Sequence, residues 1–103
     1  MAAMSNPDSL VLPDGWWRPE PEFAASLERE AAVEIGPGHK LHGQALTVLA
    51  ACQACDHFAF RTTAGFAIVH LSMIRRQDRP PWPSAHLFGS RPGLEAAMVA
   101  HQH

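Results

Sequence analysis

Two pairs of potential metal ligands lie close together in the sequence. His39 and His42 are separated by two residues, and so are Cys52 and Cys55, with His57 two residues further on. Histidine nitrogens and cysteine thiolates at such spacings are common ligands of structural zinc. The ten residues from His42 to Cys52 nevertheless span about 33 Å as a strand or about 15 Å as a helix, too far for ligands about 2.0–2.3 Å from one ion. We therefore predict two separate structural features, with no metal ligand and no cofactor. A small zinc-binding protein or a histidine- or cysteine-dependent enzyme that uses these residues is the alternative.

The cysteine pair also has the spacing of a redox site. A redox-active Cys-x-x-Cys sequence needs its first cysteine at the N-terminus of a helix, where the helix dipole lowers the thiol pKa. Here Cys55 leads directly into a predicted strand, so no helix supplies that dipole. We expect Cys52 to end a strand as a small buried group and Cys55 to lie in the following turn.

No other set of side chains predicts catalysis. His70 lies between Val69 and Leu71 in a predicted strand, where a histidine more often makes a structural hydrogen bond than it catalyses a reaction. No serine lies in a glycine-flanked nucleophile elbow, and no glycine-rich phosphate loop is present. Carboxylates could act as acid and base, but the five candidates lie on or near one predicted helix, whose charged side we expect to face solvent. They are Glu20, Glu22, Glu28, Glu30 and Glu34.

The segment between Arg75 and Ser84 has the composition of a binding surface. Its three prolines favour an exposed loop, and it also contains three arginines and one tryptophan. Tryptophan and arginine dominate the residues that stabilise protein interfaces. We therefore predict a small non-enzymatic module that binds a protein partner, such as an inhibitor, an immunity protein or an anti-defence protein of bacterial or phage origin. The alternative is a mobile loop whose tryptophan folds back onto the core. The predicted partner-binding residues are Arg75, Arg76, Arg79, Trp82 and Trp17.

Length and charge limit the classes of protein to which the chain can belong. Its 103 residues suffice for one domain, and 47% hydrophobic against 17% charged residues is typical of a folded globular chain. The formal net charge of −2 is too weak to direct the chain to nucleic acid or to an anionic membrane. No secretory signal and no apolar run of about 18–20 residues is present, so we expect a cytoplasmic protein without a membrane span.

Hydrophobic periodicity predicts a helix over residues 21–34. Phe23, Leu27 and Ala31 are spaced at i, i+4 and i+8, which places them on one face. We expect the helix to stop at residues 36–38, where glycine can supply a left-handed cap and proline cannot continue the hydrogen-bond ladder.

The middle of the chain predicts an antiparallel sheet. Residues 57–61 alternate, residues 62–65 form a turn that contains a glycine, and residues 66–73 are rich in β-forming side chains, so this segment predicts a hairpin. Residues 44–52 could form a strand or a buried helix, and we favour a strand. Residues 85–88 can add a short edge strand, through which a homodimer could also form.

A second helix is expected to close the domain. Ser90 is suited to cap its first turn, and Leu94 and Met98 form its apolar stripe, which His101 extends.

The predicted elements form one α+β domain over residues 16–103. It consists of an N-terminal helix, a three- to four-stranded antiparallel sheet and a C-terminal helix. Residues 1–15 show little periodicity and predict a flexible arm. The adjacent Trp16 and Trp17 predict a hydrophobic staple before the first helix, with one ring buried and the other at the surface.

Three stretches of the chain resemble a family of short, uncharacterised bacterial proteins. They are residues 21–30, residues 36–43, which contain the sequence PGHKLHG, and residues 68–72. The family has a PGHxLHG turn after the helix, an acidic pair that opens the middle strand, and a VHLTW strand. In this chain His57 replaces the second acid and Met73 replaces the tryptophan. The resemblance spans about residues 20–85 and implies a bacterial origin and a compact fold, without an activity.

The resemblance also bears on the paired histidines. In a turn between a helix and a strand, His39 can cap backbone groups and His42 can pack against the sheet. We expect this structural use in preference to metal binding.

Overall fold

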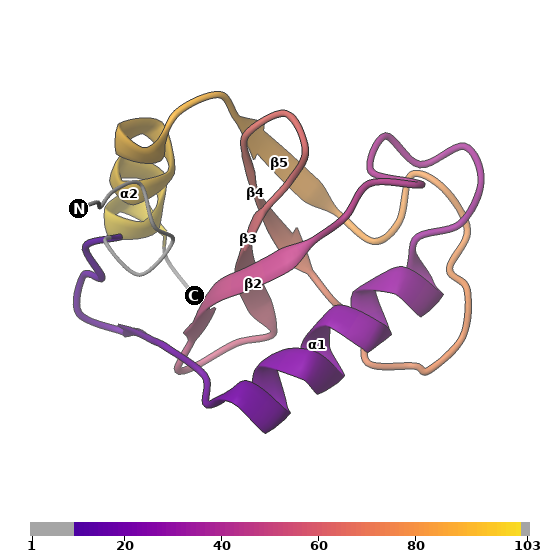
Figure 1. Ribbon diagram of the computed structural model, residues 1–103, viewed down its shortest axis with the longest axis horizontal. Helices are drawn as coiled ribbons and strands as arrows, with labels where there is room; N and C mark the ends of the chain where they lie inside the picture. Colours follow the sequence, from indigo (N-terminus) through magenta and orange to yellow (C-terminus); the bar gives the residue numbers. More distant parts are fainter. Residues whose placement is uncertain (1–9, 102–103) are drawn as a thin grey trace, which may run out of the picture.

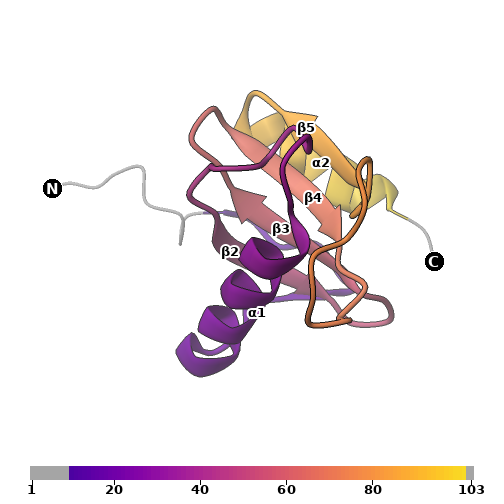
Figure 2. The ribbon, with the colours of Figure 1, turned by 90° about the vertical axis from the view of Figure 1, so that its right-hand side faces the viewer.

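The sheet of this protein lies between two helices that cover opposite faces (Figures 1 and 2). The computed structural model describes residues 10–101, so residues 1–9 of the expected arm lie outside the described residues. The elements are β1 (Trp16–Trp17), α1 (Pro21–Glu34), β2 (Thr47–Cys52), β3 (His57–Arg61), β4 (Phe66–His70), β5 (Ala85–Phe88) and α2 (Arg91–Ala100). The strands are antiparallel and lie in the order β1-β2-β3-β4-β5, so each pairs with its neighbour in the sequence.

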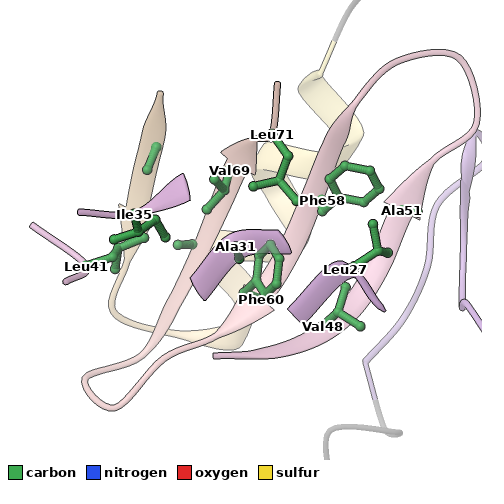
Figure 3. Packing of buried hydrophobic residues seen from close by; sticks show 12 residues of the cluster. Leu27, Ala31, Ile35, Leu41, Val48, Ala51, Phe58, Phe60, Val69 and Leu71 are labelled. Atoms are coloured by element: carbon green, nitrogen blue, oxygen red, sulfur yellow. The ribbon is translucent and has the colours of Figure 1, made fainter. Parts of the chain in front are cut away.

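The α1 face of the sheet holds the first of two apolar clusters (Figure 3). Leu27 and Ala31 of α1 are fully buried there against Phe58 and Phe60 of β3 and Val69 of β4. Successive side chains of a strand point to opposite faces, so every second residue of β3 and β4 joins this cluster. Truncating a side chain of this kind, as in Leu27→Ala, typically lowers the free energy of unfolding by about 2–5 kcal/mol.

The α2 face holds the second cluster. Leu94 and Met98 of α2 pack there together with Ala59 and Ile68, the residues of β3 and β4 that point away from α1. The indole N–H of Trp16 donates a 3.1 Å hydrogen bond to the Met98 carbonyl oxygen, which fixes the last turn of α2 to the sheet.

A β-bulge in β2 changes which of its residues face each helix. The pairing of β2 with β3 shifts register between Val48 and Ala50. Leu49 and Ala50 therefore both join the α2 cluster, although adjacent strand residues normally point to opposite faces. Beyond the bulge Ala51 faces α1 and Cys52 faces α2.

The sheet has five strands, one more than the upper limit predicted from the sequence. The additional strand is Trp16–Trp17, which pairs with Cys52 and Ala51 of β2. Trp16 is buried and Trp17 is at the surface, as the staple prediction required, but the pair extends the edge of the sheet. A strand of two residues has too few positions to show a period of two, so periodicity could not reveal it.

The other predicted elements are confirmed with small changes at their ends. Residues 47–52 form a strand and not a helix, and the predicted hairpin is present. Its second strand ends at His70, before Met73, whose backbone is left-handed (φ 60°). Helix α1 ends at Glu34, and its C-cap residue Ile35 is extended (φ −83°), so the helix has no left-handed glycine cap. The left-handed residue is Gly38, further along the turn (φ 93°).

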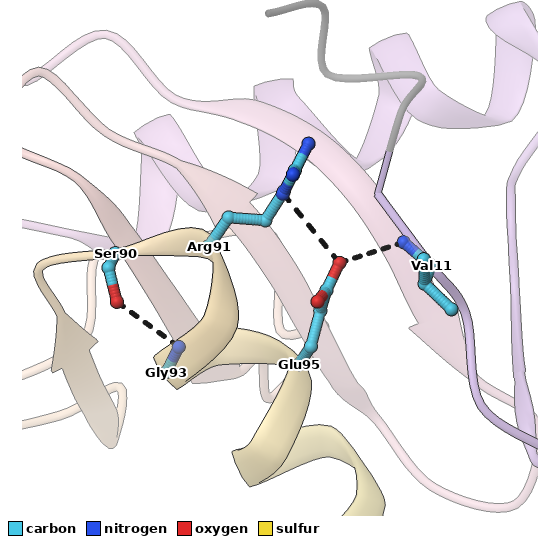
Figure 4. A network of polar contacts seen from close by, with 5 residues as sticks. All are labelled: Val11, Ser90, Arg91, Gly93 and Glu95. Atoms are coloured by element: carbon cyan, nitrogen blue, oxygen red, sulfur yellow. Dashed lines mark hydrogen bonds and ion pairs between the residues drawn. The ribbon is translucent and has the colours of Figure 1, made fainter.

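Helix α2 is capped at its beginning by Ser90 and contacts the N-terminal segment through Glu95 (Figure 4). Ser90 Oγ accepts a 3.2 Å hydrogen bond from the Gly93 N–H, as the sequence predicts for a capping serine. The Val11 N–H donates a 2.9 Å hydrogen bond to Glu95, and the neighbouring Leu10 is buried in the α2 cluster. The helix ends at Ala100, so His101 follows it as the C-cap and does not extend its stripe. Within residues 10–101, neither helix has the length and apolar character needed to cross a bilayer.

Candidate functional site

Residues 72–84, which make up nearly all of the connection between β4 and β5, pass beside the C-terminal half of α1 (Figure 2). We call this segment the 72–84 loop. The Glu34 carboxyl group accepts hydrogen bonds from the Ser72 N–H at 2.9 Å, the Ser72 hydroxyl at 3.0 Å and the Met73 N–H at 2.7 Å. One buried side chain of α1 thus holds the beginning of the loop at three points.

Further hydrogen bonds continue this attachment along the loop. Glu30, one turn before Glu34, accepts a 2.8 Å hydrogen bond from the Arg75 N–H. The Asp78 N–H donates a 2.9 Å bond to the Glu34 carbonyl oxygen. Within the loop, the Trp82 N–H donates a 2.9 Å bond to the carbonyl oxygen of residue 79. The backbone of the loop therefore has a defined conformation over most of its length.

Two residues of the loop have backbone conformations that L-amino acids rarely adopt. Met73 and Arg75 have φ angles of 60° and 62°. A left-handed conformation in a residue other than glycine costs about 1–3 kcal/mol and persists where the surroundings enforce it. The N–H groups of these two residues bond to Glu34 and Glu30, so the two carboxyl groups stabilise the unusual conformation.

The two glutamates contradict the expectation that the charged side of the first helix faces solvent. Glu34 is fully buried and Glu30 is nearly so. Burial, and then the hydrogen bond with Glu30, raise the pKa of Glu34. The same hydrogen bond lowers the pKa of Glu30, and so do the backbone N–H and the guanidinium group of Arg75. The signal for their burial was present in the sequence, because Glu30 and Glu34 follow Leu27 at i+3 and i+7, on the apolar stripe.

The loop presents most of the predicted partner-binding residues to solvent. Trp82 is 55% exposed and does not fold back onto the core. The three arginines of the loop are also exposed, as are Met73 and Ile74. A pocket of about 410 Å³ adjoins the tryptophan. Its other lining residues are Gly38, His39, Lys40, Pro81, Ser84 and Ala85. Arg75, Arg76, Arg79 and Trp82 are thus exposed residues of one loop.

Trp17 lies apart from this loop. Its ring stacks on Phe23 at the beginning of α1, with ring centroids 5.8 Å apart. The loop contacts α1 at Glu30 and Glu34, near the other end of the helix.

The paired histidines lie before β2 and the cysteines at its far end, so the two pairs are separate features, as predicted. The Nδ1 atom of the buried His39 accepts a 3.0 Å hydrogen bond from the Leu41 N–H, and its Nε2 lies 2.7 Å from the Pro83 carbonyl oxygen. His39 therefore caps backbone groups as expected and connects its turn to the 72–84 loop. His42 is exposed and not buried against the sheet, with Nδ1 3.4 Å from the Ile35 carbonyl oxygen.

The two cysteines lie close to His101, which spacing along the sequence did not associate with them. The ligand atoms of Cys52, Cys55 and His101 all lie within 4.8 Å of one another. Cys55 Sγ is 3.3 Å from His101 Nε2 and 3.2 Å from His57 Nδ1. The His57 ring also stacks on His70 across the β3–β4 ladder, with centroids 4.4 Å apart. We call Cys52, Cys55, His57 and His101 the cysteine–histidine cluster.

Electrostatics keep two members of this cluster, Cys55 and His57, uncharged at neutral pH. Burial, together with the neighbouring Cys52, raises the pKa of the Cys55 thiol to about 11. Burial, and then the charges of three surrounding histidines, lower the pKa of His57 to about 4. They are His70, His101 and His86. A protonated thiol is a poor nucleophile, which argues against redox chemistry in this state.

Comparison with known proteins does not assign the chain to a family. No family model matches it, and neither a curated protein nor a solved structure matches it significantly.

Proposed function

We propose that this protein is a small, non-enzymatic, cytoplasmic interaction module that binds an acidic surface of a protein partner through the 72–84 loop. The observation that carries this proposal is the attachment of an exposed loop, which contains three arginines and one tryptophan, to two buried carboxyl groups of α1. Protein partners of this kind include the targets of bacterial or phage inhibitors, immunity proteins and anti-defence proteins.

The defined backbone of the loop supports a role in binding. A loop that is ordered before it meets its partner loses less conformational entropy on association, which strengthens binding. Buried carboxyl groups and left-handed residues are costly to maintain, and such features cluster where a segment must keep one conformation. Here they fix Met73 and Arg75 at the beginning of the exposed surface.

The charge of the loop indicates the chemistry of the partner. Three arginines accompany one acidic residue, Asp78, and Lys40 borders the adjacent pocket. Arginine guanidinium groups make bidentate hydrogen bonds with carboxylates, and the exposed Trp82 ring of the same loop supplies an apolar anchor. Asp and Glu side chains around an apolar recess on the partner would complement this surface.

The proposal can be tested by quantitative pull-down from a bacterial lysate, followed by titration of each purified candidate partner. The test variant is the triple Arg75→Ala, Arg76→Ala and Arg79→Ala, with Trp82→Ala as a second variant. We expect the triple variant to weaken binding at least about tenfold, since a few such residues dominate interface energies. Added salt should also weaken binding, because it screens the arginine charges.

A triple variant with the same change of charge serves as the matched control. Arg29→Ala, Arg61→Ala and Arg91→Ala remove three arginines outside the loop. Wild-type binding by this control, together with loss in the loop variant, supports the proposal. A partner that binds the loop variant and the wild type equally well would overturn it.

Mass measurement in solution will show whether a homodimer forms through the exposed edge at β5, where Leu87 is 50% exposed.

A further inference from the structure

The cysteine–histidine cluster collects four potential metal ligands from two distant parts of the chain. Cys52 is the last residue of β2, Cys55 lies in the turn that follows, and His57 begins β3. His101 comes from the C-terminus of α2, 46 residues after Cys55. All four are buried or partly buried.

The distances within the cluster are close to those of a tetrahedral metal site. With bonds of about 2.3 Å to sulfur and about 2.0 Å to nitrogen, neighbouring sulfur and nitrogen ligands lie about 3.5 Å apart. Cys55 Sγ lies 3.3 Å from His101 Nε2 and 3.2 Å from His57 Nδ1. Cys52 Sγ lies within 4.8 Å of both Cys55 Sγ and a ring nitrogen of His101, so these three ligands are already close together. His57 reaches the group through Cys55, and its side chain would have to move to complete the set.

We propose that Cys52, Cys55 and His101, with His57 as the fourth ligand, bind one Zn²⁺ ion. Two thiolates and two imidazoles form a ligand set of intermediate softness that favours Zn²⁺ over Mg²⁺ or Ca²⁺, which prefer oxygen ligands. Binding releases the thiol protons.

The fold builds this site through the β2 bulge. Without the additional residue at Leu49, the alternation of β2 would turn Cys52 toward α1, away from His101. The bulge turns Cys52 toward α2. The resulting site lies between the β2–β3 turn and the end of α2.

Aromatic neighbours hold the two histidine ligands in place. The Trp16 ring contacts His101 edge-on, with centroids 5.4 Å apart, and bonds to the Met98 carbonyl oxygen in the same turn. His57 stacks on His70. Neighbours that orient the ligands of a metal are a regular part of such sites. The ion would connect the C-terminus of α2 to the sheet and act as a structural crosslink.

The test is zinc binding by the reduced full-length protein, prepared without a histidine tag and stripped of metal with a chelator. We expect retention of about one equivalent of Zn²⁺ with a Kd of about 1 nM or below, within the range of structural sites. Co²⁺ in place of Zn²⁺ should give the absorption of a tetrahedral ion with thiolate ligands. Zinc should raise the Tm of the wild type.

Variants of the ligands separate a metal site from a hydrogen-bonded cluster. His101→Ala removes a ligand at the end of the described chain and should weaken zinc binding at least about tenfold without unfolding the domain. Cys55→Ser should weaken it further, and His57→Ala should weaken it least. His42→Ala, an exposed histidine outside the cluster, is the matched control and should bind zinc like the wild type.

Two results would overturn the metal site. One is retention of less than about a tenth of an equivalent of zinc by the reduced wild type, far below a structural site. The other is equal zinc affinity in His101→Ala and the wild type, which would place any bound ion elsewhere. If Cys55→Ser does not fold, the comparison of His101→Ala with His42→Ala still decides the outcome.

Discussion

Glu34 accepts a 2.7 Å hydrogen bond from the backbone N–H of Met73, 39 residues further along the chain. Both ends of this contact are unusual, since the carboxyl group is fully buried and the residue that it holds is left-handed. A helix side chain thus determines the backbone conformation of the loop that carries the proposed binding surface.

Glu34→Gln should loosen the loop and destabilise the domain. The single amide oxygen of glutamine cannot accept all three bonds from Ser72 and Met73, and its NH₂ group would face another donor. We expect a loss of about 1–3 kcal/mol in the free energy of unfolding, since a buried donor remains unpaired. Urea unfolding measures this loss, and amide hydrogen exchange of residues 72–75 should become faster.

The exposed Glu22, in the first turn of α1, provides the control for this variant. Glu22→Gln should change stability by less than about 0.5 kcal/mol. Unchanged exchange at residues 72–75 in Glu34→Gln would show that the loop does not depend on this carboxyl group.

Trp82→Ala should affect partner binding, whereas Trp16→Ala should affect the stability of the fold. Trp82 is 55% exposed, so its removal should change stability by less than about 0.5 kcal/mol while weakening partner binding. Trp16 is 6% exposed and bonds to Met98, so its removal should cost about 3–5 kcal/mol. Thermal unfolding followed by circular dichroism distinguishes them. A large loss of stability in Trp82→Ala would assign its ring to the fold and not to a binding surface.

Ser90→Ala should remove the N-cap of α2. Its hydroxyl oxygen accepts a bond from the Gly93 N–H, and the loss of such a cap costs about 1 kcal/mol. Ser26→Ala is the matched control, because that hydroxyl donates to the Phe23 carbonyl oxygen inside α1 and caps no free N–H group. Chemical denaturation of both variants tests the difference, and equal stabilities would contradict the capping role.

Local sequence signals predicted most of the fold. Helix α1 followed from the spacing of Leu27 and Ala31, and the β3–β4 hairpin followed from alternation around a turn with a glycine. Gly65 is required in that turn, because a Cβ atom there would lie 2.5 Å from the Phe88 carbonyl oxygen. These features depend on residues close in sequence, where periodicity and turn chemistry act.

The sites were harder to predict because they depend on contacts between distant residues. The bulge at Leu49 leaves no mark in the composition of β2, yet it decides which face Cys52 occupies. His101 reaches Cys55 only after α2 has packed on the sheet, and spacing along the chain cannot show this. Glu30 and Glu34 did fall on the apolar stripe of α1, but charge alone suggested a solvated face.

The neutral state of His57 should make the metal-free protein less stable in acid. Its pKa is about 4 in the folded protein, against an ordinary value of 6.5, because it is partly buried among other histidines. Above about pH 6.5, His57 is neutral in both the folded and the unfolded protein, so the stabilisation of the folded protein is fully present. As the pH falls toward about 4, the unfolded chain binds a proton that the folded protein does not, and stability falls by about 2 kcal/mol after allowance for partial exposure. Urea unfolding in the presence of a chelator measures the free energy of unfolding at several pH values. This free energy should depend less on pH in His57→Gln than in the wild type. His42→Gln, which removes an exposed histidine, should keep the wild-type dependence, and an equal slope in all three proteins would contradict the assignment to His57.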